Sequence, residues 1–268
     1  MVGPEKQKLA MLGGGILLGI GLAFAIPKLI ERPEPTAKGM VEQPCPSQVG
    51  LNAGSSHVKK YDWAWLCRFR AENAALTGKA APKVVFMGDS LTSFWEPFDP
   101  ALFAKAGAIR GIAGQSSSEM LLRFHQDVVA LRPKIVHILA GINDVGGIHG
   151  PTSPQAFKDN IRAMTDIAKA NGIVVILASI TPAVRIDWQP SITPARQIIE
   201  LNKWLRGFSA EEGLIYADYH TALSDTKGAM RPEFSNDGVH PEAAGYAVMR
   251  PILEAAIARA ESNGKPLP

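Results

Sequence analysis

Val84–Thr92 has the sequence VVFMGDSLT, in which four apolar residues lead directly into Gly-Asp-Ser. A continuous apolar run that ends at a glycine is typical of a strand buried on both faces. Gly88 allows a sharp turn, and Asp89 and Ser90 can cap the helix that follows. Ligands of open parallel sheets bind beyond the carboxyl ends of the strands. The stretch therefore predicts a buried first strand with Ser90 facing a crevice, the alternative being that Asp89 and Ser90 only cap a helix.

The chain after this stretch alternates short apolar segments with longer amphipathic ones. The further expected strands are 106–110, 135–140, 173–180 and 214–217, and the expected helices are 116–131, 153–170, 194–212 and 241–261. Such alternation favours a parallel sheet with right-handed crossovers. We therefore expect an α/β protein, a flavodoxin-like three-layer α/β/α sandwich whose five parallel strands have the order 2-1-3-4-5.

Composition narrows the class of protein. The 268 residues are 46% hydrophobic and 20% charged with a net charge of +3, which is ordinary for a globular protein. No block of Lys or Arg suggests a nucleic-acid partner. The six histidines are scattered, and neither His-Glu-x-x-His nor Cys-x-x-Cys occurs, so the sequence indicates no metal and no cofactor.

The N-terminal residues 1–30 differ from the rest of the chain. Leu9–Ile26 carries no charge and is near the lower limit of a membrane-spanning helix, which needs about 17–25 apolar residues. We expect a membrane anchor, with a signal peptide cleaved after Ala23-Phe24-Ala25 as the alternative, and a location in the cell envelope. An export segment followed by two cysteines, Cys45 and Cys67, predicts a disulfide in an oxidising compartment, the alternative being two free thiols.

The chain divides by composition into further segments. Residues 31–78 combine a Pro- and Gly-rich linker with a short amphipathic helix expected over Asp62–Leu76. The α/β domain is expected to occupy residues 79–262, with residues 263–268 as a C-terminal tail.

Polar residues that suit acyl transfer follow the expected strands. Ser90 is a candidate nucleophile, His240 a candidate base, and Asp237 lies three residues earlier, where a turn can bring its carboxylate onto the imidazole. The backbone N–H groups of Ser90 and Gly114 and the side-chain amide of Asn143 are candidate donors to an oxyanion. Each residue also has an ordinary structural interpretation as a cap, a turn or a loop residue.

Four blocks of the sequence resemble the SGNH hydrolases, also called GDSL esterases and lipases. They are Gly88–Leu91, Gly111–Gln115, Gly141–Asp144 and Asp237-x-x-His240, and the resemblance covers about residues 83–260. It is nearest to bacterial single-domain acylhydrolases that resemble lysophospholipase L1. The resemblance implies the flavodoxin-like fold, a Ser-His-Asp triad and metal-free hydrolysis of acyl esters. One departure is Ile109, where family members often have Asn before Arg-Gly.

The resemblance leaves the substrate open. We expect short acyl or acetyl esters, including those of sugars or lysophospholipids, with His149, Arg185 and Trp188 as candidate substrate contacts. Transfer of the acyl group to a sugar hydroxyl is the alternative reaction. A non-catalytic binding module with the same fold is the alternative class of protein.

Overall fold

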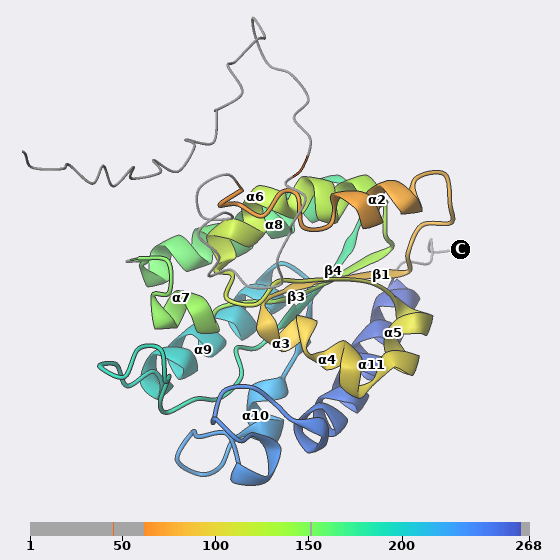
Figure 1. Cartoon of the computed structure of the whole chain (residues 1–268). Coiled ribbons are helices and arrows are strands. Elements are labelled where there is room, and N and C mark those ends of the chain that lie inside the picture. The colour runs from red at the N-terminus through yellow and green to blue at the C-terminus, as the bar shows by residue number, and fades with distance from the viewer. Residues whose placement is uncertain (1–44, 46–61, 151, 264–268) are drawn as a thin grey trace, which may run out of the picture. The chain divides into compact units, whose positions relative to one another are not determined.

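Five parallel strands form the central sheet in the order β2-β1-β3-β4-β5 (Figure 1). They are β1 Val84–Gly88, β2 Gly107–Gly111, β3 Ile135–Leu139, β4 Val174–Ala178 and β5 Ile215–Ala217. This arrangement is seen in a computed structural model that describes Cys45, residues 62–150 and residues 152–263. The predicted fold class and strand order are confirmed.

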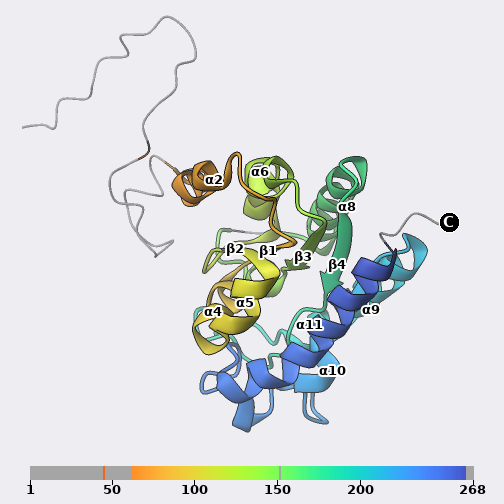
Figure 2. The ribbon, with the colours of Figure 1, turned by 90° about the vertical axis from the view of Figure 1, so that its right-hand side faces the viewer.

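Helices cover both faces of the sheet (Figures 1 and 2). The α-helices α6, α8 and α9 lie on one face, and α4, α5 and α11 lie on the other, which makes the three layers. The helices and 3-10 turns are α2 Arg70–Leu76, α3 Ser90–Ser93, α4 Trp95–Phe98, α5 Pro100–Ala106, α6 Ser117–Asp127, η1 Val129–Leu131, α7 Ile142–Gly146, α8 Pro154–Ala170, α9 Ala195–Glu211, α10 Tyr219–Leu223, η2 Pro232–Phe234 and α11 Ala243–Asn263.

The register of the sheet aligns the ends of its three adjacent strands β2, β1 and β3. Gly88 at the end of β1 is paired with Gly111 of β2 and with Leu139 of β3. All five residues of β1 and of β3 are buried, as expected for strands covered on both faces. Because these strands end at one level, the loops that follow them meet at one edge of the sheet.

A cluster of aromatic side chains joins α4 to α11 below this edge. The Trp95 ring stacks on Tyr246 with centroids 5.2 Å apart, and the Tyr246 hydroxyl donates a hydrogen bond of 2.9 Å to the Leu91 carbonyl. Both rings are almost fully buried. The packing fixes the short helix that begins at Ser90 against the long helix that follows His240.

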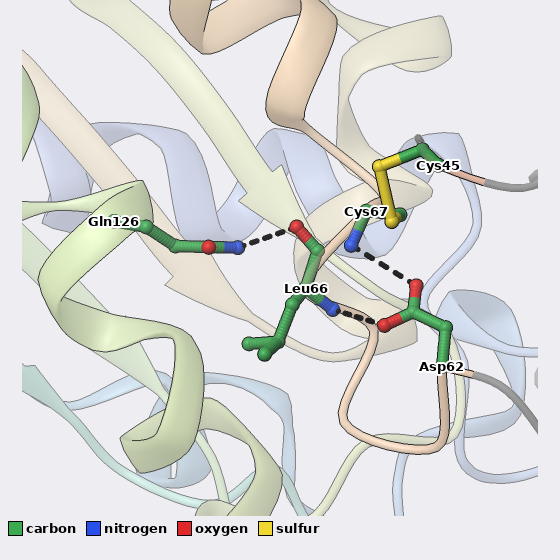
Figure 3. The surroundings of a disulfide bond; sticks show 5 residues. All are labelled: Cys45, Asp62, Leu66, Cys67 and Gln126. Carbon is green, nitrogen blue, oxygen red and sulfur yellow. Dashed lines mark hydrogen bonds between the residues drawn. A yellow bond between two sulfur atoms is a disulfide. The ribbon is translucent and has the colours of Figure 1, made fainter. Parts of the chain in front are cut away.

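The helix expected over residues 62–76 is shorter in the structure. Only Arg70–Leu76 is helical, because the Asp62 carboxylate accepts hydrogen bonds from the N–H groups of Leu66 (2.8 Å) and Cys67 (3.0 Å) and holds the preceding residues in turns (Figure 3). Trp65 takes a left-handed conformation (φ 57°) within this turn and is buried. The helix expected over 116–131 is also divided, into α6 and η1.

Cys45 and Cys67 form a disulfide with their Cα atoms 5.5 Å apart (Figure 3). Within the described residues, no helix is both long enough and apolar enough to cross a membrane. The anchor expected in residues 1–30, residues 31–44 and 46–61 of the expected linker, and the last five residues of the expected tail lie outside the described residues.

Candidate active site

Three side chains far apart in the sequence form a continuous hydrogen-bonded chain. Ser90 Oγ lies 2.9 Å from His240 Nε2, and His240 Nδ1 lies 2.6 Å from Asp237 Oδ2. Ser90 is almost fully buried, whereas His240 is partly exposed and Asp237 is exposed. The serine thus lies below a histidine that solvent can reach.

Local structure explains how each of these residues reaches the site. Ser90 is the first residue of α3, and the preceding residue, Asp89, caps this helix by accepting a hydrogen bond of 2.9 Å from the Leu91 N–H. Gly238 has φ 77°, a conformation that glycine adopts without strain. This turn lets Asp237 Oδ1 accept hydrogen bonds of 2.8 Å from the backbone N–H groups of both Val239 and His240. The acid and the imidazole therefore form one local unit.

The surroundings of Asp237 favour its charged form. Partial burial on its own would raise the pKa, but hydrogen bonds from the His240 ring and from the backbone N–H groups of His240 and Val239 lower the pKa to about 2. The Ser235 hydroxyl donates a further hydrogen bond of 3.0 Å to Asp237 Oδ1. An ionised carboxylate at Nδ1 orients the imidazole so that Nε2 can accept a proton from Ser90 Oγ.

The predicted oxyanion donors come from the segments that directly follow β1, β2 and β3. Gly114 lies in the turn after β2 with φ 83°, and Asn143 lies in α7 and is almost fully buried. The Asn143 amide Nδ2 donates a hydrogen bond of 3.0 Å to the carbonyl of Gln115. Because an amide nitrogen carries two hydrogens, a second N–H of Asn143 remains for another acceptor.

The three candidate substrate contacts occupy different places. The Trp188 ring lies 6.0 Å from the His240 ring, centroid to centroid, and is partly exposed. His149 Nε2 instead lies 2.9 Å from the carbonyl oxygen of Gly114, so it contacts the glycine turn. Arg185 is exposed and pairs with Asp187 at 2.9 Å. Of the three, Trp188 is the one that the structure places against the Ser90–His240–Asp237 chain.

Comparison with known proteins identifies the family. The model of the GDSL-like lipase/acylhydrolase family matches residues 86–248, which include all five candidate residues of the site. The chain belongs to this family.

Solved structures agree with this assignment. A protein of Bacteroides fragilis assigned as an acylhydrolase is 37% identical, with a TM-score of 0.70 over 74% of this chain and 98% of that one. A GDSL-like lipase of Bacteroides thetaiotaomicron is 35% identical, with the same TM-score and coverage. A variant of an acetyl-xylooligosaccharide esterase from a Geobacillus species is 20% identical (TM-score 0.53, 66% and 94% covered), which shows the fold alone. A search of curated proteins gave no match.

Several residues of this GDSL-like acylhydrolase site were missed by the sequence analysis. The Phe94 ring lies 5.5 Å from His240 and is 45% exposed. Arg123 is fully buried and donates a hydrogen bond to the Gln115 side chain, next to Gly114. Asn73 of α2 donates a hydrogen bond to Asp127, which lies beside Arg123 in α6. One signal for Arg123 was its place beside Met120, Phe124 and Asp127 on one face of α6, where an Arg–Asp pair falls among apolar residues.

Asp89 of the GDSL motif is buried in this acylhydrolase without a full set of partners. Its Oδ2 atom has no hydrogen-bond partner among the described residues. Burial raises the pKa of Asp89 to about 7; the Leu91 N–H lowers it and the charge of Asp144 raises it further. The folded protein therefore keeps a proton on Asp89 that the unfolded chain releases near pH 4.

We expect Asp89→Asn to change how stability depends on pH. Between about pH 4 and pH 7 the unfolded state releases the Asp89 proton and the folded state keeps it. This lowers the stability of the wild type by up to about 1.4 kcal/mol per pH unit. The variant has no such proton and keeps the acceptor for the Leu91 N–H. Urea unfolding of both proteins should show the variant gaining in relative stability from pH 4 to 7 and no further above it.

A stability difference between Asp89→Asn and the wild type that is constant from pH 4 to 8 would contradict this expectation. Asp144, whose pKa is also raised by burial, is present in both proteins, so the difference between them reports the titration of Asp89 together with the effect of the Asp144 charge on it.

Proposed function

We propose that the protein is a serine esterase that hydrolyses carboxylic esters through an acyl-serine intermediate. The observation that carries the proposal is the hydrogen-bonded chain from Ser90 Oγ through His240 to Asp237 at the end of β1. Membership of the acylhydrolase family supports hydrolysis of an acyl ester.

In the first half of the reaction, His240 Nε2 takes the proton from Ser90 Oγ as this oxygen attacks the ester carbonyl. The carbonyl oxygen becomes an oxyanion, which accepts hydrogen bonds from the N–H groups of Ser90 and Gly114 and from the Asn143 amide. His240 Nε2 then gives its proton to the leaving alcohol, and the acyl group remains on Ser90. In the second half, water takes the place of the alcohol, His240 removes its proton, and the acid leaves as Ser90 recovers a proton.

The surroundings of His240 support a preference in the alcohol part of the ester. The leaving oxygen must come within hydrogen-bond distance of His240 Nε2 to receive its proton. The alcohol therefore lies near the two partly exposed rings that contact His240, those of Phe94 and Trp188. Aromatic rings of this kind bind apolar faces, including the C–H faces of sugars. We therefore propose short acyl or acetyl esters of sugar or lipid alcohols as the substrates.

We also propose that the protein acts in the cell envelope, on the membrane. The support is the uncharged run Leu9–Ile26 together with the Cys45–Cys67 disulfide, because disulfides persist in oxidising compartments. Fractionation of cells that make the full-length chain tests this location, and recovery of the protein in the cytosol with reduced thiols would contradict it.

The function is tested first by labelling. An aryl phosphonate that mimics the tetrahedral intermediate should modify Ser90 and stop hydrolysis of nitrophenyl esters, with the modified residue identified by mass spectrometry. Hydrolysis should be fastest for acetyl to butyryl esters in a series of acyl lengths. Adding a sugar acceptor tests acyl transfer. If an acylated sugar forms in preference to the free acid, the protein is an acyltransferase and not a hydrolase. A folded protein with no esterase activity and no label on Ser90 would overturn both.

A further inference from the structure

Arg123 connects the ends of two strands to the turn that contains Gly114. Its side chain is fully buried, and Nη2 donates hydrogen bonds to the carbonyls of Gly88 (3.2 Å) and Arg110 (2.8 Å). Its Nε donates a hydrogen bond of 2.6 Å to the side-chain oxygen of Gln115. Gly88 is the last residue of β1 and lies two residues before Ser90, and Gln115 directly follows Gly114. One guanidinium therefore holds the backbone near Ser90 and the turn that contains Gly114.

The buried guanidinium needs a counter-ion, and α6 supplies it. Arg123 Nη1 lies 3.0 Å from Asp127 Oδ2, and both side chains are completely buried. Burial lowers the pKa of Arg123 to about 10 and the charge of Asp127 raises it, so Arg123 stays charged at neutral pH. Leaving a buried charge without its partner strongly destabilises a protein. The cluster is therefore held in the geometry in which Arg123 and Asp127 are paired.

Asn73 completes the cluster from a part of the chain that the family model does not match. Its Nδ2 donates a hydrogen bond of 2.7 Å to Asp127 Oδ1, and its Oδ1 accepts hydrogen bonds from Nε (2.9 Å) and Nη2 (2.6 Å) of Arg110. The Phe69 ring lies under Arg110, 4.8 Å from its guanidinium carbon. Asn73 thereby ties the second strand, through Arg110, to the acid that holds Arg123.

The segment that carries Asn73 is fastened at two consecutive residues, Leu66 and Cys67, in the turn that precedes α2. The disulfide joins Cys67 to Cys45, and the Gln126 side chain of α6 donates a hydrogen bond of 2.7 Å to the Leu66 carbonyl (Figure 3). Trp65, Phe69 and Ile112 form a small buried apolar cluster of their own, and Ile112 lies two residues before Gly114. The segment therefore packs directly behind the glycine turn.

From Gln115 the connection continues to the other oxyanion donor. The Gln115 carbonyl accepts the hydrogen bond of 3.0 Å from Asn143 Nδ2. A movement of Gln115 would therefore shift the N–H of Gly114 and turn the amide of Asn143 together.

We propose that Arg123 and Asn73 are positioning residues that hold the Gly114 turn and the Asn143 amide in the orientation that binds the oxyanion. This inference rests on the esterase function proposed above. Neither residue touches the substrate; both act through Gln115.

The test compares Arg123→Lys and Asn73→Ala with the wild type in hydrolysis of nitrophenyl acetate, per active site titrated with the phosphonate. Lysine keeps the charge opposite Asp127 but cannot donate to Gln115, Gly88 and Arg110 at once. A small misplacement of catalytic groups costs up to about 100-fold, so kcat of Arg123→Lys should fall about 10- to 100-fold with KM nearly unchanged. Asn73→Ala should show a smaller loss in kcat, again without a change in KM.

Two comparisons separate positioning from a general loss of stability. Ile215→Ala empties a buried position in β5, at the opposite edge of the sheet from β2, and should lower Tm while leaving kcat per titrated site unchanged. In an Asn143→Ala background, Arg123→Lys should cost less than it does in the wild type, because one donor that it positions is already gone. If Arg123→Lys fails to fold, the same cycle is made with Asn73→Ala.

A measurement that does not depend on catalysis tests the positioning role separately from the esterase activity. The side-chain amide NMR signals of Asn143, assigned by their loss in Asn143→Ala, should shift in Arg123→Lys and Asn73→Ala and stay in place in Ile215→Ala. A wild type without esterase activity would remove the catalytic role but not the effect on these signals. Unchanged Asn143 signals, unchanged kcat per site, or losses that add fully to that of Asn143→Ala would overturn the positioning role.

Discussion

Ser90→Ala and His240→Ala should each lower kcat for ester hydrolysis by about 10⁴-fold or more. Without Ser90 no acyl intermediate forms, and without His240 the hydroxyl that it contacts at 2.9 Å has no base. Because the two side chains act as one unit, the double variant should be hardly slower than either single one. Initial rates with nitrophenyl acetate, measured well above KM, give the comparison.

Stability supplies the control for this experiment. Ser90 and His240 lie at a loop edge of the sheet and not in its apolar core, so circular dichroism and Tm should change little in either variant. Phosphonate labelling should persist weakly in His240→Ala and vanish in Ser90→Ala. A folded Ser90→Ala protein with wild-type turnover would end the serine-esterase interpretation.

Asn143→Ala should lower kcat by about 10²–10³-fold, equal to about 3–4 kcal/mol, and leave KM nearly unchanged. The proposed hydrogen bond acts on charge that develops in the transition state, so its loss affects kcat rather than substrate binding. The backbone donors of Ser90 and Gly114 remain in this variant. It should therefore be impaired, yet more active than Ser90→Ala.

Asn143→Asp distinguishes the oxyanion donor from a structural cap. An ionised carboxylate has no N–H, would repel the oxyanion and would face the Gln115 carbonyl that the amide contacts at 3.0 Å, so this variant should be slower than Asn143→Ala. If Asn143 only capped a turn, Asp would replace it well. Near wild-type kcat in a folded Asn143→Asp enzyme would refute the oxyanion role.

Local patterns in the sequence were enough to predict most of the fold. The apolar run of Val84–Gly88 is hydrophobic on both faces because its strand is covered on both faces. The alternation of short apolar segments with longer amphipathic ones located the other strands to within two residues at each end. Asp237 and His240 are three residues apart around a glycine, so their contact is local and their spacing predicts it. The family resemblance, drawn from four short blocks, is confirmed by the family model.

The features that only the tertiary structure decided depend on contacts between residues that are far apart in the sequence. No periodicity links Asn73 with Arg110 and Asp127, or His149 with the carbonyl of Gly114, because these pairs form only when the sheet and its helices have packed. The extent of α2 was missed for a related reason. The Asp62 side chain captures the backbone N–H groups that a longer helix would have used, and this competition between a side chain and the helix is settled by three-dimensional geometry.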